Sequence, residues 1–273
     1  MRKMNRKILF VDYDDTLLCS DKSVTAENRK ALLEVLAAGH YLAFTTGRPL
    51  HGAKVFFDRL DLPRDHCYLL CYQGCVLYDL ARQETVMSKT MDSDALGALI
   101  ALLQERDIYY QAFALDRFYC PAYTEVTRRY CENTREPYEV LKTPEQLLEQ
   151  KIYKVMAIDF YDRRPLAALQ QQVTSDPIFP FQSFFSSPWF YEFCAKGQDK
   201  GSGLRYLADV LCIPRSDTIA VGDEENDIPM IEAAGIGVAM CNARDEIKAH
   251  ADVVTTRDNN HSGVAEVIRR YLL

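Results

Sequence analysis

The sequence predicts a two-part α/β protein: a core with a Rossmann-like, mainly parallel sheet, and an inserted α+β domain. Short, wholly apolar runs alternate with helical patterns at both ends of the chain. The middle, from about residue 82 to residue 194, is rich in aromatic residues and has fewer such runs. The predicted domains are therefore 1–81 and 195–273 for the core, and 82–194 for the insert.

The first core segment predicts strand, helix, strand and strand in that order. Residues 8–11 form a continuous apolar run, which is typical of a strand covered on both faces. Thr25 is a suitable N-cap for the helix that follows, and Gly39 suits its end. Residues 41–44 and 68–71 are the next apolar runs. Short connections through a helix predict parallel pairing of these strands.

The second core segment repeats this order after about residue 200. We expect strands at 218–221 and 236–240, with a helix at 228–234 between them. Two further helices are indicated by apolar positions at helical spacing: Leu204, Leu207, Ala208 and Leu211 in one, and Val264, Val267, Ile268 and Tyr271 in the other.

The insert is predicted to hold a different kind of sheet. Residues 96–103 have helical spacing, whereas 109–115, 153–160 and 189–194 resemble strands with one face less buried. That pattern favours an antiparallel or mixed sheet, so we predict an α+β domain.

Composition excludes several classes of protein. With 48% hydrophobic residues and a formal net charge of -7, the chain is neither disordered nor a general nucleic-acid binder. No apolar run is long enough for a membrane span, and the run that ends at Asp12 is too short for an export signal. We therefore expect a cytoplasmic protein whose nine cysteines are reduced thiols.

Two aspartates follow the first predicted strand directly. Asp12 and Asp14 stand at the carboxyl end of that strand, which is where open α/β sheets bind ligands. Two carboxylates this close repel each other unless a cation or a shared proton compensates. The pair therefore indicates metal binding or acid–base chemistry, and the alternative is a polar turn with helix-capping aspartates.

A second acidic segment, residues 222–227, follows the predicted strand 218–221. If the two strands are neighbours, Asp223 and Asp227 lie close to the first pair. Several carboxylates around one crevice favour a hard cation, and oxygen ligands favour Mg²⁺. An acidic helix start would explain Glu224 and Glu225 well, but it explains Asp223 and Asp227 less well once Asp12 and Asp14 are counted.

Two weaker patterns indicate phosphate binding. The segment Thr46, Gly47 and Arg48 ends a predicted strand and offers a hydroxyl and backbone N–H groups to a phosphate oxygen. Lys200 opens the return to the core and could supply a positive charge, although Lys196 competes for the same role.

The order of these motifs resembles the haloacid dehalogenase superfamily. The resemblance rests on Asp-x-Asp-x-Thr at 12–16, Thr-Gly-Arg at 46–48, Lys-Gly at 200–201 and Gly-Asp-x-x-Asn-Asp at 222–227. A large insert between the second and third motifs, with Ile-Pro-Met at 228–230 and Asn-Ala at 242–243, is similar to the Cof-type phosphatases of subfamily IIB. The resemblance covers the core at both ends; the insert matches in position and length.

This resemblance implies a role for each motif residue. Asp12 would be the nucleophile and Asp14 the general acid/base, with Mg²⁺ held by Asp12, the backbone carbonyl of Asp14, and Asp223. The phosphate and substrate ligands would be Thr46, Gly47, Arg48, Lys200 and Asn226, with Thr16 and Asp227 in support. The chain departs from the family at Asp15, where Gly is frequent, and at Gln73, where an Asn-Gly pair is usual.

We therefore predict an Mg²⁺-dependent phosphatase that hydrolyses phosphomonoesters of small metabolites, sugar phosphates being favoured, through an aspartyl phosphate. The insert would be a mobile cap that selects the leaving group. We expect a monomer or weak homo-oligomer without nucleic-acid or membrane partners. The alternatives are a phosphotransferase or mutase on the same scaffold, and a non-catalytic metabolite-binding regulator, which would need no nucleophile.

Overall fold

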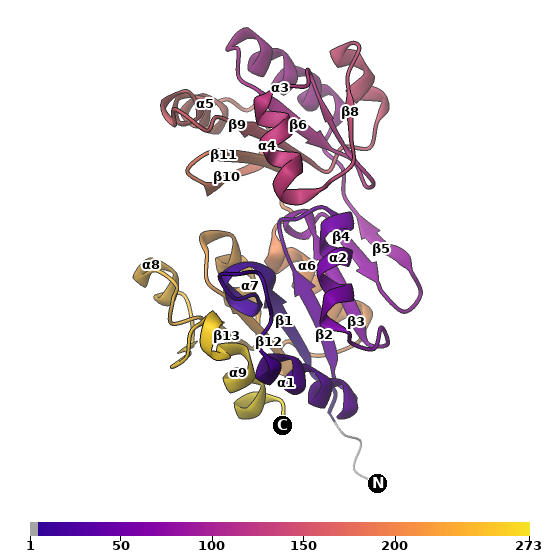
Figure 1. Cartoon of the computed structure of the whole chain (residues 1–273), viewed down its shortest axis with the longest axis vertical. Coiled ribbons are helices and arrows are strands. Elements are labelled where there is room, and N and C mark those ends of the chain that lie inside the picture. The colour runs from indigo at the N-terminus through magenta and orange to yellow at the C-terminus, as the bar shows by residue number, and fades with distance from the viewer. Residues whose placement is uncertain (1–4) are drawn as a thin grey trace. The chain divides into compact units, whose positions relative to one another are not determined.

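The computed structural model describes residues 5–273, and the chain divides into two compact units (Figure 1). The core unit comprises residues 5–47, 53–87 and 199–273 of the described chain, and the insert unit comprises 48–52 and 88–198. The first four residues of the predicted segment 1–81 lie outside the described residues. The sequence places the start of the insert at residue 82, whereas the structure keeps the strand at 84–88 in the core sheet.

The core unit is built on an eight-stranded sheet in the order β14-β13-β12-β1-β2-β3-β4-β5. The strands pair in parallel from β14 to β3, and β4 pairs antiparallel with β3. The strands are β1 (Ile8–Asp12), β2 (Tyr41–Thr45), β3 (Cys67–Cys71), β4 (Val76–Asp79), β5 (Glu84–Ser88), β12 (Thr218–Gly222), β13 (Ile236–Ala239) and β14 (Val253–Val254). Strand β1 is wholly buried, as its unbroken apolar run predicted.

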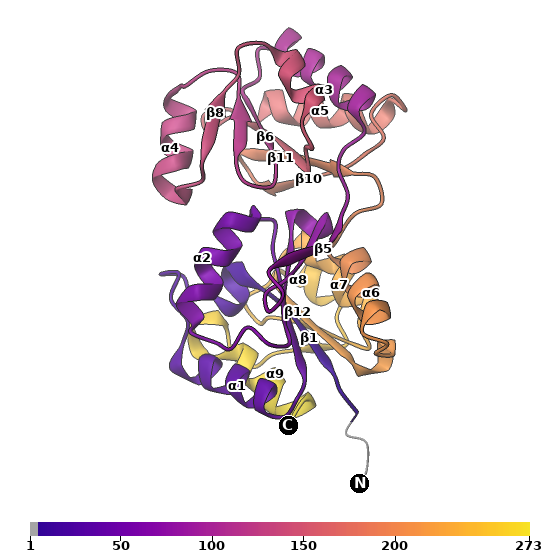
Figure 2. The ribbon, with the colours of Figure 1, turned by 90° about the vertical axis from the view of Figure 1, so that its right-hand side faces the viewer.

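Helices cover both faces of this sheet, with α6 and α7 on one side and α1, α2 and α9 on the other (Figure 2). Leu204, Leu207 and Met230 pack on Ile8 and Phe10 of the first face. The helices of the core are α1 (Ala26–Ala37), α2 (Leu50–Leu60), α6 (Lys200–Val210), α7 (Ile228–Ala233), α8 (Asp245–Lys248) and α9 (Gly263–Tyr271).

Local sequence sets the ends of these helices. Thr25 accepts a hydrogen bond from the backbone N–H of Asn28 at the start of α1, and Gly39 beyond its end has a φ of +80°. At the start of α6, the Asp199 carboxylate accepts from the backbone N–H of Ser202 at 2.6 Å. That cap fixes where Lys200 enters the helix.

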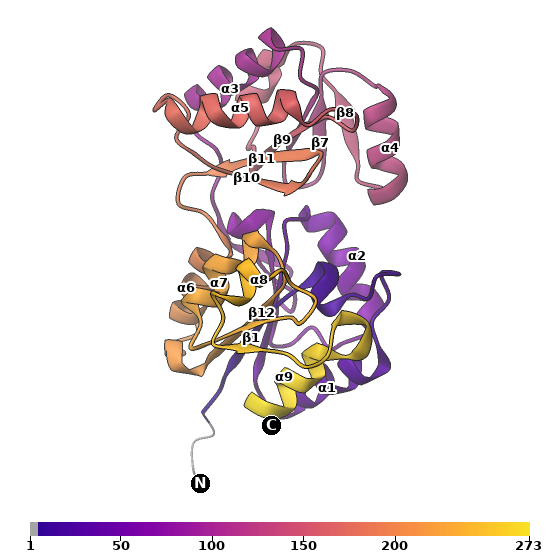
Figure 3. The same ribbon diagram turned by 90° about the vertical axis from the view of Figure 1, so that its left-hand side faces the viewer.

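The insert unit has a six-stranded sheet in the order β10-β11-β9-β6-β7-β8. Its strands pair antiparallel except β7 with β8, in agreement with the predicted α+β class. Helices α3 and α5 pack on one face (Figure 3). The elements are β6 (Tyr110–Phe113), β7 (Phe118–Cys120), β8 (Tyr138–Val140), β9 (Lys154–Ile158), β10 (Phe181–Ser187), β11 (Phe190–Ala195), α3 (Ser93–Glu105), α4 (Glu125–Thr134) and α5 (Arg164–Ser175).

Two chemical features of the whole chain complete the fold. Within residues 5–273 no helix combines the length and the apolar character that crossing a membrane requires. Each of the nine cysteines is a free thiol, and Cys67, Cys71 and Cys75 are buried in or beside β3.

Candidate active site

Parallel pairing brings the sequence motifs to one edge of the core sheet. Strand β1 lies between β12 and β2, and Asp12 is level with Thr45 while Val11 is level with Val221. Because parallel strands end at the same edge, the loops that follow all three strands meet there.

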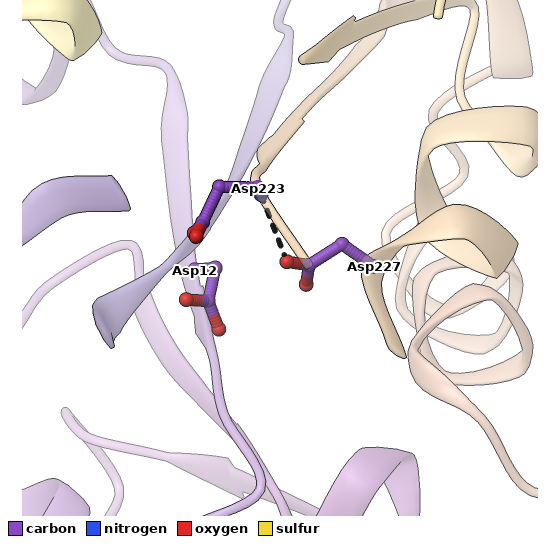
Figure 4. Close-up of side chains that lie close together, drawn as sticks. All are labelled: Asp12, Asp223 and Asp227. Carbon is purple, nitrogen blue, oxygen red and sulfur yellow. Dashed lines mark hydrogen bonds between the residues drawn. The ribbon is translucent and has the colours of Figure 1, made fainter. Parts of the chain in front are cut away.

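Three aspartates form an acidic cluster at this edge (Figure 4). Asp12, Asp223 and Asp227 each place one carboxylate oxygen within 4.8 Å of the others. Asp227 is fully buried and accepts from the backbone N–H groups of Asp223 at 3.0 Å and Glu224 at 3.1 Å. Thr16 Oγ1 donates to Asp223 at 2.5 Å. These hydrogen bonds fix the carboxylates of Asp227 and Asp223.

Lys200 contributes a cation to this cluster. Its side chain is 1% exposed, and its Nζ lies 2.6 Å from Asp12 Oδ1 and 2.5 Å from Asp227 Oδ1. Lys196, which competes for this role in the sequence, is exposed and belongs to the insert unit.

One lysine does not neutralise three carboxylates, and the pKa values of the site are shifted by burial and by this imbalance. Burial raises the pKa of Asp12 well above its usual range, Lys200 opposes that rise, and Asp227, Asp223 and Asp14 add to it. Burial and the nearby Asp227 raise the pKa of Asp223 to about 7. Burial alone would lower the pKa of Lys200, but Asp12 and Asp227 outweigh it, so this pKa lies above its usual value.

Asp14 has a more open environment than Asp12. Its side chain is 35% exposed and pairs with Lys22 Nζ at 3.0 Å. The next residue, Asp15, has a φ of +57°, which explains why glycine suits this position. Asn242 Nδ2 donates to the Asp15 carbonyl at 2.8 Å and so supports this turn from across the core.

The other predicted phosphate ligands are distributed as follows. Thr46 is buried and its backbone N–H donates to the Leu70 carbonyl at 2.9 Å; Gly47 is half-buried. Arg48 falls in the insert unit. Asn226 Nδ2 donates to Gln73 Oε1 at 3.0 Å, which joins the loop after β12 to the turn after β3.

The structure thus adds three residues near the site. Gln73 stands out in the sequence as a departure from the family pattern. Asn242 belongs to the Asn-Ala pair of the tail. Lys22 gives no signal, because a single lysine in a polar loop is usually a solvated surface group.

The donor set fits a divalent cation. Carboxylate oxygens are the ligands that Mg²⁺ prefers, and three of them with one lysine leave two formal negative charges in a buried site. A bound dication would balance those charges and lower the raised pKa values of Asp12 and Asp223.

Comparison with known proteins gives consistent matches over the whole chain. The model of the haloacid dehalogenase-like hydrolase family matches residues 9–268. YxeH of Bacillus subtilis, named provisionally as a phosphatase, is 32% identical over 269 residues and covers 98% of both chains. The 5-amino-6-(5-phospho-D-ribitylamino)uracil phosphatase YwtE of B. subtilis is 28% identical over 291 residues, covering 97% of this chain and 98% of its own.

A solved structure confirms the fold. The crystal structure of a haloacid dehalogenase-like hydrolase from Bacteroides thetaiotaomicron superposes with a TM-score of 0.87 at 24% identity, covering 97% of this chain and 99% of the other.

Proposed function

The chain belongs to the haloacid dehalogenase-like hydrolase family, and from that premise we propose an Mg²⁺-dependent phosphatase that acts through an aspartyl phosphate. Phosphatase action on small phosphorylated metabolites follows from the family and the relatives. The observation that carries the finer proposal is the buried cluster of Asp12, Asp223 and Asp227 around Lys200, which holds more negative than positive charge.

Mg²⁺ would be held by Asp12, the backbone carbonyl of Asp14, and Asp223. Bound there, it would neutralise charge on the phosphoryl oxygens. Asp227 holds Lys200 in place through its 2.5 Å contact, and Thr16 orients Asp223 through its hydroxyl. These supports limit the motion of the metal-binding oxygens.

Asp12 attacks the phosphorus atom through a carboxylate oxygen, and the bond between phosphorus and the leaving oxygen breaks. Asp14 gives its proton to the departing alkoxide. It then takes a proton from the water that attacks the aspartyl phosphate, which releases inorganic phosphate and restores Asp12. The different environments support this division of roles: Asp12 is buried against Lys200, whereas Asp14 is partly open to solvent.

The phosphoryl group carries negative charge that fixed donors stabilise during transfer. Lys200 supplies an ammonium, Thr46 a hydroxyl, and Gly47 a backbone N–H. Arg48 and Asn226 are the further polar groups that we assign to substrate binding.

We propose that sugar-like phosphates are the favoured substrates and that the insert, acting as a mobile cap, selects among them. The support is a relative, YwtE, whose named substrate carries its phosphate on a ribityl chain. We further propose that the enzyme works in the cytoplasm, which the nine free thiols support.

The test is hydrolysis of para-nitrophenyl phosphate and a panel of phosphorylated metabolites by the purified chain, with Mg²⁺ and with a chelator. We expect turnover with Mg²⁺, its loss with the chelator, and higher kcat/KM on sugar and polyol phosphates than on nucleotides. Binding without turnover would contradict the proposal and favour a regulator. Transfer of phosphate to a sugar hydroxyl instead of water would favour a phosphotransferase.

A further inference from the structure

The turn after β3 has an unusual backbone. Tyr72, Gln73 and Gly74 all have positive φ values, of 52°, 56° and 97°. This region suits glycine, and among other residues asparagine is enriched there, so tyrosine and glutamine are costly choices. Gln73 is also only 2% exposed, although glutamine is usually a surface residue. A buried polar residue whose backbone is strained and that lies beside a site is a candidate for a functional role.

The Gln73 side chain lies between two loops of the candidate site. Its Oε1 accepts from Asn226 Nδ2 at 3.0 Å. Its amide nitrogen lies so close to Gly47 that a Cβ on that glycine would be 2.4 Å away. The backbone N–H of Gln73 also donates to the Thr46 carbonyl at 3.2 Å. Gln73 therefore contacts the loop after β2 and the loop after β12.

The same turn contacts the start of helix α6. A Cβ on Gly74 would lie 2.1 Å from the backbone oxygen of Asp199, the residue that caps the helix opened by Lys200. Three segments that carry candidate phosphate ligands thus meet at this turn.

We propose that Gln73 is a positioning residue that sets the distance between Asn226 and the Thr46–Gly47 loop. This inference rests on the phosphatase function proposed above. Phosphoryl transfer depends mainly on how accurately charged and polar groups are placed around phosphorus. A glutamine reaches Asn226 from this turn, while the asparagine usual in the family is one methylene shorter. The contact with Asn226 that this length allows offsets the unfavourable backbone conformation of Gln73.

Gln73→Asn separates positioning from simple packing. Asparagine tolerates the left-handed backbone better, so the melting temperature should stay level or rise. Its amide cannot contact both Asn226 and Gly47, so kcat on para-nitrophenyl phosphate with Mg²⁺ should fall about tenfold, with a smaller change in KM. Gln73→Met, which keeps the length but loses the amide, should give a similar fall in kcat.

The matched control is Gln83→Asn. Gln83 is also a glutamine with a φ of 56°, but it is exposed in the turn between β4 and β5. We expect unchanged kcat for this variant. A double-mutant cycle with Asn226→Ala supplies the second readout: Gln73→Asn should cost little more in that background, because its partner is already gone.

Two kinetic results would overturn the inference: kcat of Gln73→Asn equal to that of the wild type, or full additivity with Asn226→Ala. The rise in melting temperature on adding inorganic phosphate together with Mg²⁺ is a readout that needs no turnover, and we expect a smaller rise in Gln73→Asn and an equal one in Gln83→Asn. If the wild type itself hydrolyses no phosphate ester, the proposed function fails; a phosphate response in Gln73→Asn equal to that of the wild type would then reject the positioning role separately.

Discussion

Lys200 of the core and Lys154 of the insert are both buried beside carboxylates, yet the two surroundings differ in charge balance. Lys154 Nζ lies 3.1 Å from Glu192 Oε2 and 4.8 Å from the centre of the Phe113 ring. Ser186 donates to the other oxygen of Glu192 at 2.6 Å. Glu136 nearby is also buried, which raises its pKa, while His51, Lys154 and Arg48 oppose that rise. Glu192 and Glu136 of the insert thus have cations near them.

The core edge lacks this balance. Lys200 contacts Asp12 and Asp227, and Asp223 completes a cluster with two formal negative charges in excess. Uncompensated charge in a buried site destabilises the folded protein, so this cluster does not serve the stability of the fold alone. The net formal charge of each cluster, and not the number of its contacts, therefore distinguishes a structural ion pair from a site suited to a cation.

The largest expected effect is that of Asp12→Asn. The amide is a poor nucleophile and a weaker Mg²⁺ ligand, so kcat should fall to below about one thousandth of the wild-type value on alkyl and aryl phosphates alike. Asp245→Asn is the control, because the Asp245 side chain is 96% exposed. Substantial turnover by Asp12→Asn would remove Asp12 from its proposed role.

A matched pair of lysine variants tests the comparison itself. Lys200→Met should lower kcat by about 10²-fold or more, because a fixed donor to the transferring phosphoryl group is lost. Lys154→Met should instead lower the free energy of unfolding by about 3–5 kcal/mol, since it leaves Glu192 buried without its ion pair. We would measure kcat and denaturant unfolding for both. If Lys154→Met lowered kcat and Lys200→Met mainly lowered the free energy of unfolding, charge balance would not distinguish the two sites.

The dependence of the melting temperature on Mg²⁺ and pH should also distinguish the acidic cluster of the core from the ion pair of the insert. Asp223 has a folded-state pKa of about 7, above its ordinary value of 3.8. Without metal, this group stabilises the fold as pH falls from above 7 toward 3.8, and the stabilisation is lost as pH rises through about 7. Mg²⁺ should raise the melting temperature most at high pH, where it need not displace a proton.

Thermal melts at pH 6 and pH 8, with Mg²⁺ and with a chelator, measure this effect. Asp223→Asn should show a smaller pH dependence without metal and a smaller rise with Mg²⁺. An unchanged Mg²⁺ response in this variant would place the metal elsewhere.

The smallest expected effect is that of Lys196→Met. Lys196 precedes a glycine, as Lys200 does, but it is exposed in the insert unit. Its kcat should stay within about twofold of the wild-type value on para-nitrophenyl phosphate, because Lys196 has no role in the proposed mechanism and substitutions of exposed residues usually perturb the fold little. A fall as large as that of Lys200→Met would mean that Lys196, four residues earlier, also acts as a phosphate-binding lysine.

Local patterns were sufficient to predict the strands that carry the site. The apolar runs of β1, β2 and β12, and the rule that parallel strands end at one edge, predict that the motifs share that edge. That β1 and β12 are neighbours, which brings Asp12 close to Asp223 and Asp227, comes from the structure. The roles of these residues stay predictions. The hairpin of β4 and β5 was not expected, since β5 at the end of the sheet is largely exposed and lacks the apolar run of a central strand.

Contacts between residues far apart in the chain could not be predicted from local sequence patterns either. Gln73 and Asn226 are 153 residues apart, and nothing in a tyrosine followed by a glutamine predicts two left-handed residues in succession. Lys22 pairs with Asp14 only because its loop folds back over the turn after β1.

The most direct test of the account is to trap the covalent intermediate. Asp14→Asn should slow hydrolysis of the aspartyl phosphate, because the water then lacks its base, while a nitrophenolate still leaves without an acid. After rapid acid quench during turnover of para-nitrophenyl phosphate with Mg²⁺, peptide mass spectrometry should locate one phosphoryl group on Asp12. Phosphate on any other residue, or continued turnover with no phosphorylated protein, would contradict the mechanism proposed here.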